Sequence, residues 1–370
     1  MVLCKSKDNT LFDFDPRSFI ENKISLSEIA DDINYIPLDN SCPLGLIHDN
    51  IEFINNSFYL SENQLGILVF DINGDLIRKI GSKGRGPGEY LYTFDFTVDE
   101  ETETIYVWDN NIIKVFSKNG NFLRSFSLKE YGGFIHPIKF LNSTLFSFFS
   151  VQFENVENKW IANDSLGNLI RKEKRKTPKF TRDFSAGEGA YVFQNKVTYW
   201  NSINDTVFSI SPNLAENPSY LLSPGEHRYP KSQKNVPFDD MTKYLSIIQI
   251  FETEHFLIIR YFYKEGKYIR FFEKEKRITY QVDWEFDGST GIINDLDGGP
   301  GFIPKIYFKR NGAEFIGGLI NPIQLISLVS SIEFQDFTPK YSNKKKELER
   351  LANRLKETDN PILVIIKLKK

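Results

Sequence analysis

Charged and aromatic side chains suited to ligand binding lie mainly in the connections between apolar runs of this 370-residue chain. One such connection is the glycine-rich segment 81–90, and another is the segment 224–231, which has a proline at each side of its polar residues. Loops on a rigid scaffold commonly carry binding residues, and long loops are often functional. We therefore predict a ligand site built from loop residues. Its candidates are Arg85, Glu89, Tyr90, His136, His227, Arg228 and Tyr229.

The glycine-rich segment 81–90 has the composition of a phosphate-binding loop but lacks its spacing. A P-loop needs Gly-Lys-Ser/Thr after four intervening residues, which is absent here. A dinucleotide-binding loop needs a third glycine at the position where this chain has Glu89. The segment is interpreted instead as a sharp connection between two elements, from which Arg85 and Glu89 reach a ligand.

Metal and nucleophile motifs are also incomplete. Segment 294–298 places Asp295 and Asp297 on a turn, but an EF-hand loop needs a further oxygen ligand before its glycine and a later Glu. The four histidines lack zinc-ligand spacing, and no Gly-x-Ser-x-Gly elbow occurs. We predict no cofactor and no metal centre, with Asp295 and Asp297 as the remaining metal candidates. A single divalent cation held from several loops and a glycosidase-like carboxylate pair both stay open.

The overall composition and charge of the chain argue against nucleic acid as a partner and against a transmembrane helix. A formal net charge of -3 and a pI near 6.0 give no basic field, so nucleic acid is not expected as a partner. No run of about 18 apolar residues occurs, so no transmembrane helix is expected. Aromatic residues make up 15% of the chain and suit the half-buried surfaces of strands.

The two cysteines exclude a disulfide-stapled scaffold and suggest one modification. The simplest interpretation of Cys4 and Cys42 is two thiols, with a disulfide between them left open. Cys4 is followed by polar residues, as is the lipidated first residue of a mature bacterial lipoprotein. Leu3 stands where such a protein normally has a small residue, and residues 1–3 are too short to be a signal. Despite these two departures, the polar residues that follow Cys4 make it a candidate for lipidation.

An internal sequence repeat indicates the strands that carry these loops. Residues 68–80 and 113–126 both read as an alternating strand, an Asn-Gly turn and a second alternating strand. Asn-Gly is typical of a two-residue type I′ hairpin. The pairs Asn73-Gly74 and Asn119-Gly120 lie 46 residues apart, which is the spacing of four-stranded propeller blades.

Strand and turn signals along the chain predict an all-β fold, a six-bladed β-propeller. The sixth blade is expected to include a strand at 323–328 and to lack a clean outer strand. The predicted innermost strands are 51–54, 94–98, 137–141, 189–193, 245–251 and 303–308.

The chain ends are expected to close the ring. Leucines recurring at helical spacing predict one amphipathic helix at about 343–357, followed by a closing strand at about 361–367. A strand at 29–38 is also expected, so both ends of the chain supply strands to one blade. Residues 1–27 are assigned to a polar lead-in, and residues 28–370 to a single propeller domain.

Several motifs resemble known propellers. The segment Ile80–Tyr90 resembles the connection between blades in NHL-type propellers, and Ile105–Asp109 and Ile113–Phe116 also resemble that repeat. More closely, the chain resembles six-bladed β-propeller proteins of Bacteroidetes, many of them predicted lipoproteins of unknown function. The resemblance spans most of 28–368 and implies the fold more directly than an activity.

The functional expectation is a non-enzymatic scaffold at the bacterial cell envelope. It presents loops around a channel to a glycan, peptide or protein, and it is expected to be a monomer. The alternative is a propeller-type hydrolase or lyase that acts on a glycan or similar substrate at the channel mouth. A cytoplasmic location also stays open.

Overall fold

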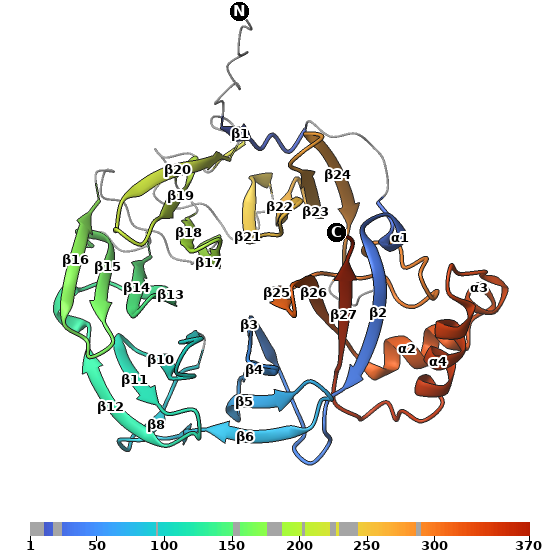
Figure 1. Cartoon of the computed structure of the whole chain (residues 1–370), viewed down its shortest axis with the longest axis horizontal. Helices are drawn as coiled ribbons and strands as arrows, with labels where there is room; N and C mark the ends of the chain where they lie inside the picture. Colours follow the sequence, from blue (N-terminus) through green and yellow to red (C-terminus); the bar gives the residue numbers. More distant parts are fainter. Residues whose placement is uncertain are drawn as a thin grey trace, which may run out of the picture.

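The computed structural model describes residues 11–17, 24–93, 95–150, 156–175, 187–201, 204–222, 227–228, 243–285 and 290–370. Six sheets, each with four antiparallel strands, surround a central axis, which confirms the predicted six-bladed β-propeller (Figure 1). Blade 1 consists of β3 (Ile47–Ile54), β4 (Ser57–Glu62), β5 (Gly66–Asp71) and β6 (Leu76–Ile80). Blade 2 consists of β9 (Phe96–Val98), β10 (Ile105–Asp109), β11 (Ile112–Phe116) and β12 (Phe122–Ser127).

The next three blades follow the same order from the axis outward. Blade 3 consists of β13 (Ile135–Leu141), β14 (Thr144–Phe149), β15 (Asn158–Asp164) and β16 (Leu169–Lys174). Blade 4 consists of β17 (Gly189–Phe193), β18 (Lys196–Trp200), β19 (Thr206–Ile210) and β20 (Glu216–Leu221). Blade 5 consists of β21 (Ser246–Glu252), β22 (Phe256–Tyr263), β23 (Gly266–Glu273) and β24 (Ile278–Asp283). A short parallel pair, β7 (Ser82–Lys83) and β8 (Glu89–Tyr90), follows blade 1.

Blade 6 is a composite of both chain ends, as predicted. Its strands in spatial order are β25 (Ile306–Arg310), β26 (Ala313–Ile320), β27 (Ile362–Leu368) and β2 (Ala30–Pro37). The C-terminal strand β27 therefore lies inside the sheet, paired with β26 on one side and with the N-terminal strand β2 on the other. The N-terminal strand β2 is therefore the outermost strand of blade 6, which the residues after blade 5 do not supply.

The prediction of a strand at 323–328 is wrong, because these residues belong to helix α2 (Pro322–Val329). Asn321 and Gln324 form a capping box, and Pro322 occupies the first helical position. Both features favour a helix start. Leu325 and Val329 are buried at helical spacing.

Helices α2, α3 (Ile332–Asp336) and α4 (Ser342–Ala352) form an insertion between β26 and β27, on the outer side of blade 6 (Figure 1). Helix α4 ends at Ala352, five residues before the predicted end at 357. Leu348 is buried, whereas Leu351 and Leu355 are partly buried against the same core. The predicted apolar stripe therefore packs as expected, although its last leucine lies beyond the helix.

The hairpin turns differ from the prediction in a consistent way. In Asn73-Gly74 and Asn119-Gly120 only the glycine has a positive φ, and each turn is followed by a register shift in the pairing. The prediction of type I′ geometry at these turns is therefore wrong, since type I′ needs positive φ at both residues. Among the described residues, six other two-residue turns have that geometry: 55–56, 110–111, 142–143, 194–195, 264–265 and 311–312.

The core lies between the blades, because each sheet packs on a neighbour through both faces. Tyr59, Ile67 and Val69 of blade 1 belong to one buried cluster with Phe96 and Val107 of blade 2. This two-sided burial explains why β5 is apolar at nearly every position rather than at alternate ones. Each such side chain contributes roughly 1.5–3 kcal/mol.

The described part of the N-terminal segment is attached to the propeller. Strand β1 (Phe12–Asp13) pairs in parallel with β20 and adds a fifth strand to blade 4. Phe14 is buried against Tyr261, and the guanidinium of Arg270 donates to the carbonyls of Asp15 (3.0 Å) and Pro16 (2.8 Å). Within 1–27, the segment expected as a polar lead-in, the structure thus places a strand and several buried apolar side chains. Those side chains are Phe14, Ile24 and Leu26.

Candidate functional site

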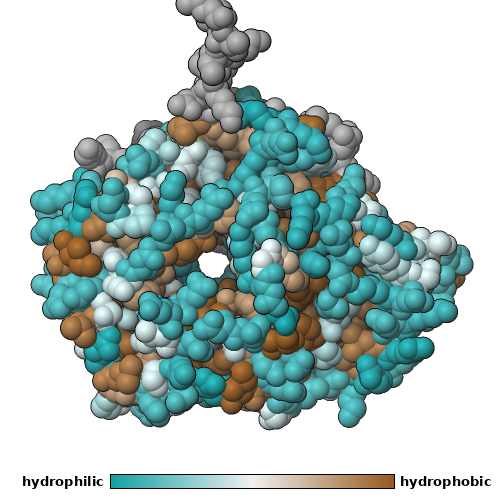
Figure 2. All heavy atoms as spheres, in the orientation of Figure 1, coloured by the Kyte–Doolittle hydropathy of each residue, from teal (hydrophilic) through white to brown (hydrophobic). Residues whose placement is uncertain are grey.

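The innermost strands of all six blades enclose a cavity of about 830 Å³ on the central axis. Figure 2 shows this axis as an opening through the molecule. Strands β3, β9, β13, β17, β21 and β25 supply most of the lining, which places side chains from distant parts of the sequence within one space. Cavities of this size and position are the usual ligand sites of closed β architectures.

Acidic side chains dominate this channel. Eight carboxylates line the cavity among the described residues, against two lysines, so the channel has an excess of negative charge. Low-dielectric walls focus such a field and raise the local concentration of cations. The carboxylates are Asp49, Glu52, Asp95, Asp99, Glu100, Glu101, Glu188 and Glu252, and the lysines are Lys139 and Lys305.

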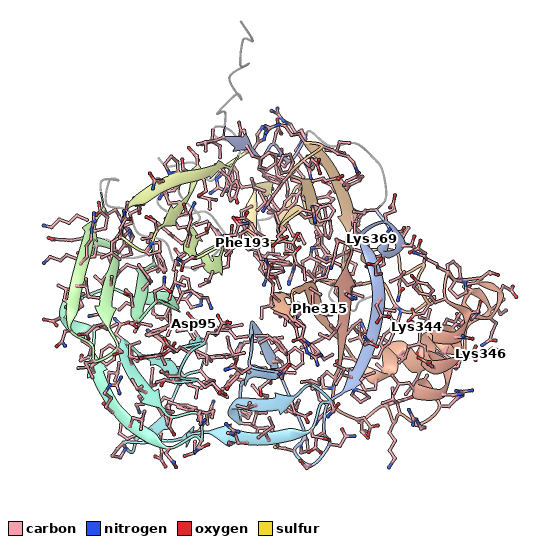
Figure 3. All side chains as sticks on the ribbon, in the orientation of Figure 1. Asp95, Phe193, Phe315, Lys344, Lys346 and Lys369 are labelled. Atoms are coloured by element: carbon pink, nitrogen blue, oxygen red, sulfur yellow. The ribbon has the colours of Figure 1, made fainter. Side chains whose placement is uncertain are left out.

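One polar network joins blades 1, 2 and 3 on the channel wall. The Lys139 amine lies 2.9 Å from Glu52 Oε1 and 3.4 Å from Asn50 Oδ1. Asn50 Nδ2 donates to Asp95 Oδ1 at 2.7 Å, and Asp95 Oδ2 accepts from the Ile138 amide at 2.5 Å. Figure 3 labels Asp95 at the inner edge of the ring. These contacts therefore hold the innermost strands of blades 1, 2 and 3 together.

Burial sets the protonation of this network. Asp95 is 3% exposed, and burial raises its pKa despite the opposing charges of Lys139 and His136. Burial alone would lower the pKa of Lys139, but Glu52 and Asp95 outweigh it and the pKa is raised. Lys139 thus keeps its positive charge, and Asp95 is the carboxyl in this network that most readily takes up a proton.

A second network joins blades 5, 6 and 1 at the ends where the innermost strands begin. Asp49 Oδ1 lies 2.7 Å from the Lys305 amine, and Asp49 Oδ2 lies 3.3 Å from Arg260 Nη2. Arg260 also donates to Gln249 Oε1 at 3.0 Å and lies over the ring of Trp284. Burial raises the pKa of Asp49, but the two cations outweigh burial and hold it below its usual value.

A third network joins blades 4 and 5. Glu252 accepts from the Tyr191 hydroxyl at 2.6 Å and from the Lys274 amine at 2.6 Å. Lys274 also lies over the ring of Phe193, which is labelled at the inner edge of blade 4 in Figure 3. Burial raises the pKa of Tyr191 well above its usual value, so this phenol stays neutral and donates. Glu252 is therefore anchored on both carboxylate oxygens.

The loop between β9 and β10 differs from these networks because two of its acids are exposed. Asp99 closes the loop by accepting from the Glu101 amide at 3.1 Å and from the Thr102 hydroxyl. Glu100 and Glu101 point to solvent and still line the cavity. The loop thus places two available carboxylates at one mouth of the channel.

Of the predicted binding residues that the structure describes, only His136 lies at the channel. His136 lines the cavity at the start of β13. Arg85 is exposed and Glu89 accepts from the Gly86 amide within its own turn, in a segment that lies at the outer rim between blades 1 and 2 (Figure 1). Tyr90 is fully buried, and its hydroxyl donates to the Ile80 carbonyl and accepts from the Ile67 amide at 3.2 Å. None of these three lines the cavity, so the predicted cluster does not assemble there.

The connection between blades 4 and 5 also has a packing role in its described part. His227 is buried, with Nδ1 2.9 Å from the Tyr263 hydroxyl. Arg228 is 3% exposed and donates to the carbonyls of Asn204 (3.1 Å) and Leu245 (3.4 Å). Neither residue lines the channel cavity. Tyr229, like the lipidation candidate Cys4, lies outside the described residues, whereas Cys42 has a free thiol.

The residues that do line the channel were missed for an identifiable reason. Glu52, Asp95 and Lys139 lie within or next to the predicted innermost strands, where a charged side chain among apolar neighbours must face the channel or be paired. The signal is therefore a charged residue inside a strand, whereas the predicted site consists mainly of loop residues. Cross-blade partners such as Asn50 and Asp95 are 45 residues apart and cannot be paired from spacing alone.

Two further observations bear on the class of protein. No group of three or more His, Cys, Asp or Glu side chains that could hold a metal ion occurs within the described ranges. Over the same ranges, no helix is long and apolar enough to cross a membrane.

The fold and the channel together define a six-bladed β-propeller with an acidic axial cavity. The chain belongs to the family described as "Domain of unknown function (DUF4934)", whose model matches residues 11–367. None of the curated proteins matches it.

Two solved structures from Bacteroides share this fold. A "Putative exported protein" from Bacteroides fragilis has a TM-score of 0.71 at 19% identity, covering 95% of this chain and 99% of that one. A member of the DUF4221 family from Bacteroides vulgatus has a TM-score of 0.53 at 13% identity, covering 95% and 99%. At these identities the likeness concerns the fold.

Proposed function

We propose that this protein is a non-enzymatic binding scaffold of the bacterial cell envelope, and that its channel binds a positively charged segment of a peptide or protein. The observation that carries the proposal is the excess of carboxylates on the channel lining. A lysine- or arginine-rich segment complements that charge, and complementary charge gives both specificity and rapid association. The same field repels a phosphate backbone and offers a neutral glycan no electrostatic gain.

The distribution of paired and unpaired acids indicates where the ligand meets the protein. Glu52, Asp49 and Glu252 are already engaged by lysines or an arginine, so they mainly fix the innermost strands. Glu100 and Glu101 are exposed at the mouth, and within the described part of the chain neither carboxylate forms an ion pair. We therefore assign first contact with a cationic ligand to these two residues.

The envelope location rests on three separate supports. The name of the Bacteroides fragilis neighbour proposes that it is exported. The chain resembles propellers that include predicted lipoproteins, and Cys4 is a candidate for lipidation. Fractionation of cells that express the full-length gene, with and without Cys4→Ala, tests this. We expect the native protein with the membranes, and its presence in the cytoplasm would contradict the location.

The binding proposal is tested with a fluorescein-labelled octalysine peptide and fluorescence anisotropy. We expect saturable binding at low salt that weakens steeply as salt rises. The double variant Glu100→Gln/Glu101→Gln should weaken binding about five- to thirtyfold, because two exposed charge contacts contribute roughly 0.5–1 kcal/mol each.

The matched control for this test removes two carboxylates elsewhere. Glu347→Gln/Glu349→Gln on α4 changes the net charge by the same amount on the outer helices. It should leave the affinity within about twofold of the native protein, since its charges are screened at that distance. Equal weakening by both double variants would show a diffuse charge effect, and no binding by the native protein would refute the proposal.

A second candidate function is a hydrolase or lyase that acts at the channel. The observation that favours it is the raised pKa of the Asp95 carboxyl beside Lys139 and His136, since a carboxyl that keeps its proton can act as a general acid. Against it, both Asp95 oxygens are engaged by Asn50 and Ile138. Turnover of a glycan panel that is abolished in Asp95→Asn would establish this alternative.

A further inference from the structure

The loop that connects blade 5 to blade 6 holds together three parts of the chain. Asp295 accepts from the Ser27 amide (2.8 Å) and hydroxyl (2.5 Å), which fixes the start of α1 (Leu26–Ile29). The carbonyls of Asp295 and Leu296 accept from the amides of Lys340 (2.9 Å) and Tyr341 (2.8 Å), next to the start of α4. Of the two aspartates that the sequence singled out, Asp295 thus ties the N-terminal segment to the ring.

The other aspartate, Asp297, belongs to a buried polar cluster with Asn294 and Tyr35. The Tyr35 hydroxyl, from β2, donates to Asp297 Oδ1 at 3.2 Å and accepts from Asn294 Nδ2 at 3.0 Å. The Gly299 amide donates to the same Asp297 oxygen at 2.8 Å. A Cβ at Gly299 would lie 2.1 Å from the Tyr35 hydroxyl, 2.7 Å from Asn294 Nδ2 and 3.0 Å from Asp297 Oδ1. The three polar groups therefore converge over a backbone position that has room only for glycine.

Two oxygen atoms of this cluster are buried and lack a hydrogen-bond donor in the described structure: Asp297 Oδ2 and Asn294 Oδ1. Asp297 is fully buried and Asn294 is 6% exposed. A buried carboxylate oxygen without a partner is costly, and buried charges are normally paired or bound to a cation. The nearby amine of Lys344 is already engaged, 2.5 Å from Asp32 Oδ1 and 2.7 Å from the Ile33 carbonyl.

We propose that this cluster is a binding site for a single hard cation, with Asp297 Oδ2 and Asn294 Oδ1 as its side-chain ligands. Carboxylate and amide oxygens are the ligands that Ca²⁺ prefers, and backbone carbonyls or water commonly complete its coordination. A cavity of about 780 Å³ lies beside the cluster and is lined by Asn294, Gly298 and Gly299, whereas Asp297 lies behind this lining. The cation neutralises Asp297 and, through Tyr35, connects the loop to the outermost strand of blade 6.

The chemistry of the site is shared by Ca²⁺ and Na⁺, so the test separates them. Full-length protein treated with EDTA is melted in CaCl2, MgCl2, NaCl or choline chloride at equal ionic strength. A cation that binds the native state should raise the Tm by about 2 °C or more at saturation. Asp297→Asn, which keeps the shape of the side chain, should abolish that rise. No rise with any of these cations would overturn the site.

A neighbouring carboxylate supplies the matched control. Asp295→Asn removes the contact with Ser27 and should lower the Tm, but it should leave the cation-dependent rise intact. If Asp295→Asn abolished the rise as fully as Asp297→Asn, the response would be a general effect on the loop, and the assigned ligands would be wrong.

A gain-of-function variant distinguishes a cation site from a buried, protonated carboxyl. Asn294→Asp adds a second carboxylate, which should tighten Ca²⁺ binding about tenfold in a calorimetric titration, because ligand charge sets the affinity of such sites. If Asp297 is instead a neutral acid bonded to Asn294, the variant should be less stable and Ca²⁺ should not restore it. That outcome would refute the proposal even if Asp297→Asn failed to fold.

Discussion

Blade 2 and blade 6 have the same four-stranded antiparallel sheet but assemble it from very different stretches of chain. Strands β9 to β12 lie within residues 96–127, and each pairs with its neighbour in the sequence. Blade 6 combines β25 and β26 with β27 from the C-terminal end and β2 from the N-terminal end. Blade 2 therefore forms from local contacts, whereas blade 6 requires both ends of the chain to meet, which is entropically costly and slow.

Corresponding asparagines show the same contrast. Asn111 follows β10 in blade 2, and its amide joins that blade to the Gly133 carbonyl and the Ile135 amide of the next segment, about 24 residues away. Asn360 precedes β27 in blade 6, and its amide joins that blade to the connection 39–44, more than 300 residues away. Both residues attach a blade to the following one, but only Asn360 also closes the ring.

The largest expected effect comes from removing the strand that closes blade 6. Truncation after Thr358 deletes β27, whose residues Ile362–Ile366 are buried and paired on both sides. We expect loss of cooperative unfolding or strong self-association, because β26 gains an unpaired, apolar edge and β2 loses its partner strand. Circular dichroism melting and size-exclusion chromatography measure this.

A single substitution keeps this test interpretable if the truncated chain does not fold. Ile366→Ala in β27 removes a fully buried side chain paired with Ile33 and Ile316, and should lower the free energy of unfolding by about 2–5 kcal/mol. A monomeric truncated protein with an unchanged melting curve would show that the ends do not close the ring.

The contrast between blades 2 and 6 also explains which parts of the fold could be predicted from the sequence. The repeat at 68–126 identified the propeller because strand order and turn spacing are local there. The closing strands were predictable from their apolar runs, but helix α2 was mistaken for a strand because Ile323, Leu325 and Leu328 fit an apolar pattern of either kind. The capping box of Asn321 and Gln324 was the signal that separates them.

The next largest effect is expected at Asn360. Asn360→Ala leaves the Leu44 amide and the carbonyls of Asp39 and Cys42 without their side-chain partner, and should lower the free energy of unfolding by about 2–4 kcal/mol. Asn111→Ala in blade 2 is the matched variant and should lower it by a similar amount. Urea unfolding of both variants checks this, and a neutral Asn360→Ala would mean that the C-terminal connection contributes little to closure.

The site was less predictable than the fold for a physical reason. A channel in a radial fold is formed by one strand from each blade, so its partners are separated by a whole repeat or more. Asp49, Arg260 and Lys305 form one network from blades 1, 5 and 6, and no local pattern relates them. His136 was found because its position before Pro137 marks the start of an innermost strand.

A smaller, pH-dependent effect is expected at Tyr90, in the connection that leads into blade 2. Burial raises the pKa of Tyr90 to about 12, whereas an unfolded tyrosine titrates near 10. The folded state holds the proton more tightly, so the contribution to stability is complete below about pH 9 and is lost as the pH rises from 10 towards 12. Tyr90→Phe should be less stable at pH 7 by about 1–2 kcal/mol.

The measurement is urea unfolding of both proteins between pH 7 and 11.5. The difference between native and Tyr90→Phe should shrink by about 1–2 kcal/mol over the alkaline part of this range, since only the native protein has the Tyr90 proton to lose. A difference that stays constant to pH 11.5 would show that the Tyr90 hydroxyl is not protected by its burial between blades 1 and 2.

The smallest expected effect is at the Asn119-Gly120 turn, which belongs to the internal repeat that predicted the propeller. Gly120 has a φ of +84°, and a Cβ there would lie 3.0 Å from the Lys79 carbonyl of blade 1. Gly312, in the β25–β26 turn of blade 6, has a φ of +71°, and a Cβ there would meet no atom within 4 Å. Gly312→Ala should therefore lower the free energy of unfolding by the backbone strain alone, about 1 kcal/mol, and Gly120→Ala by slightly more. Urea unfolding of Gly312→Ala and Gly120→Ala separates the effect of backbone strain from that of the contact with the Lys79 carbonyl.

The two glycine variants also serve as a comparison for Asn360→Ala. Because turn strain stays local whereas Asn360 joins distant segments, both glycine variants should remain more stable than Asn360→Ala. The reverse order would mean that the local turns, rather than the meeting of the chain ends, carry the stability of the ring.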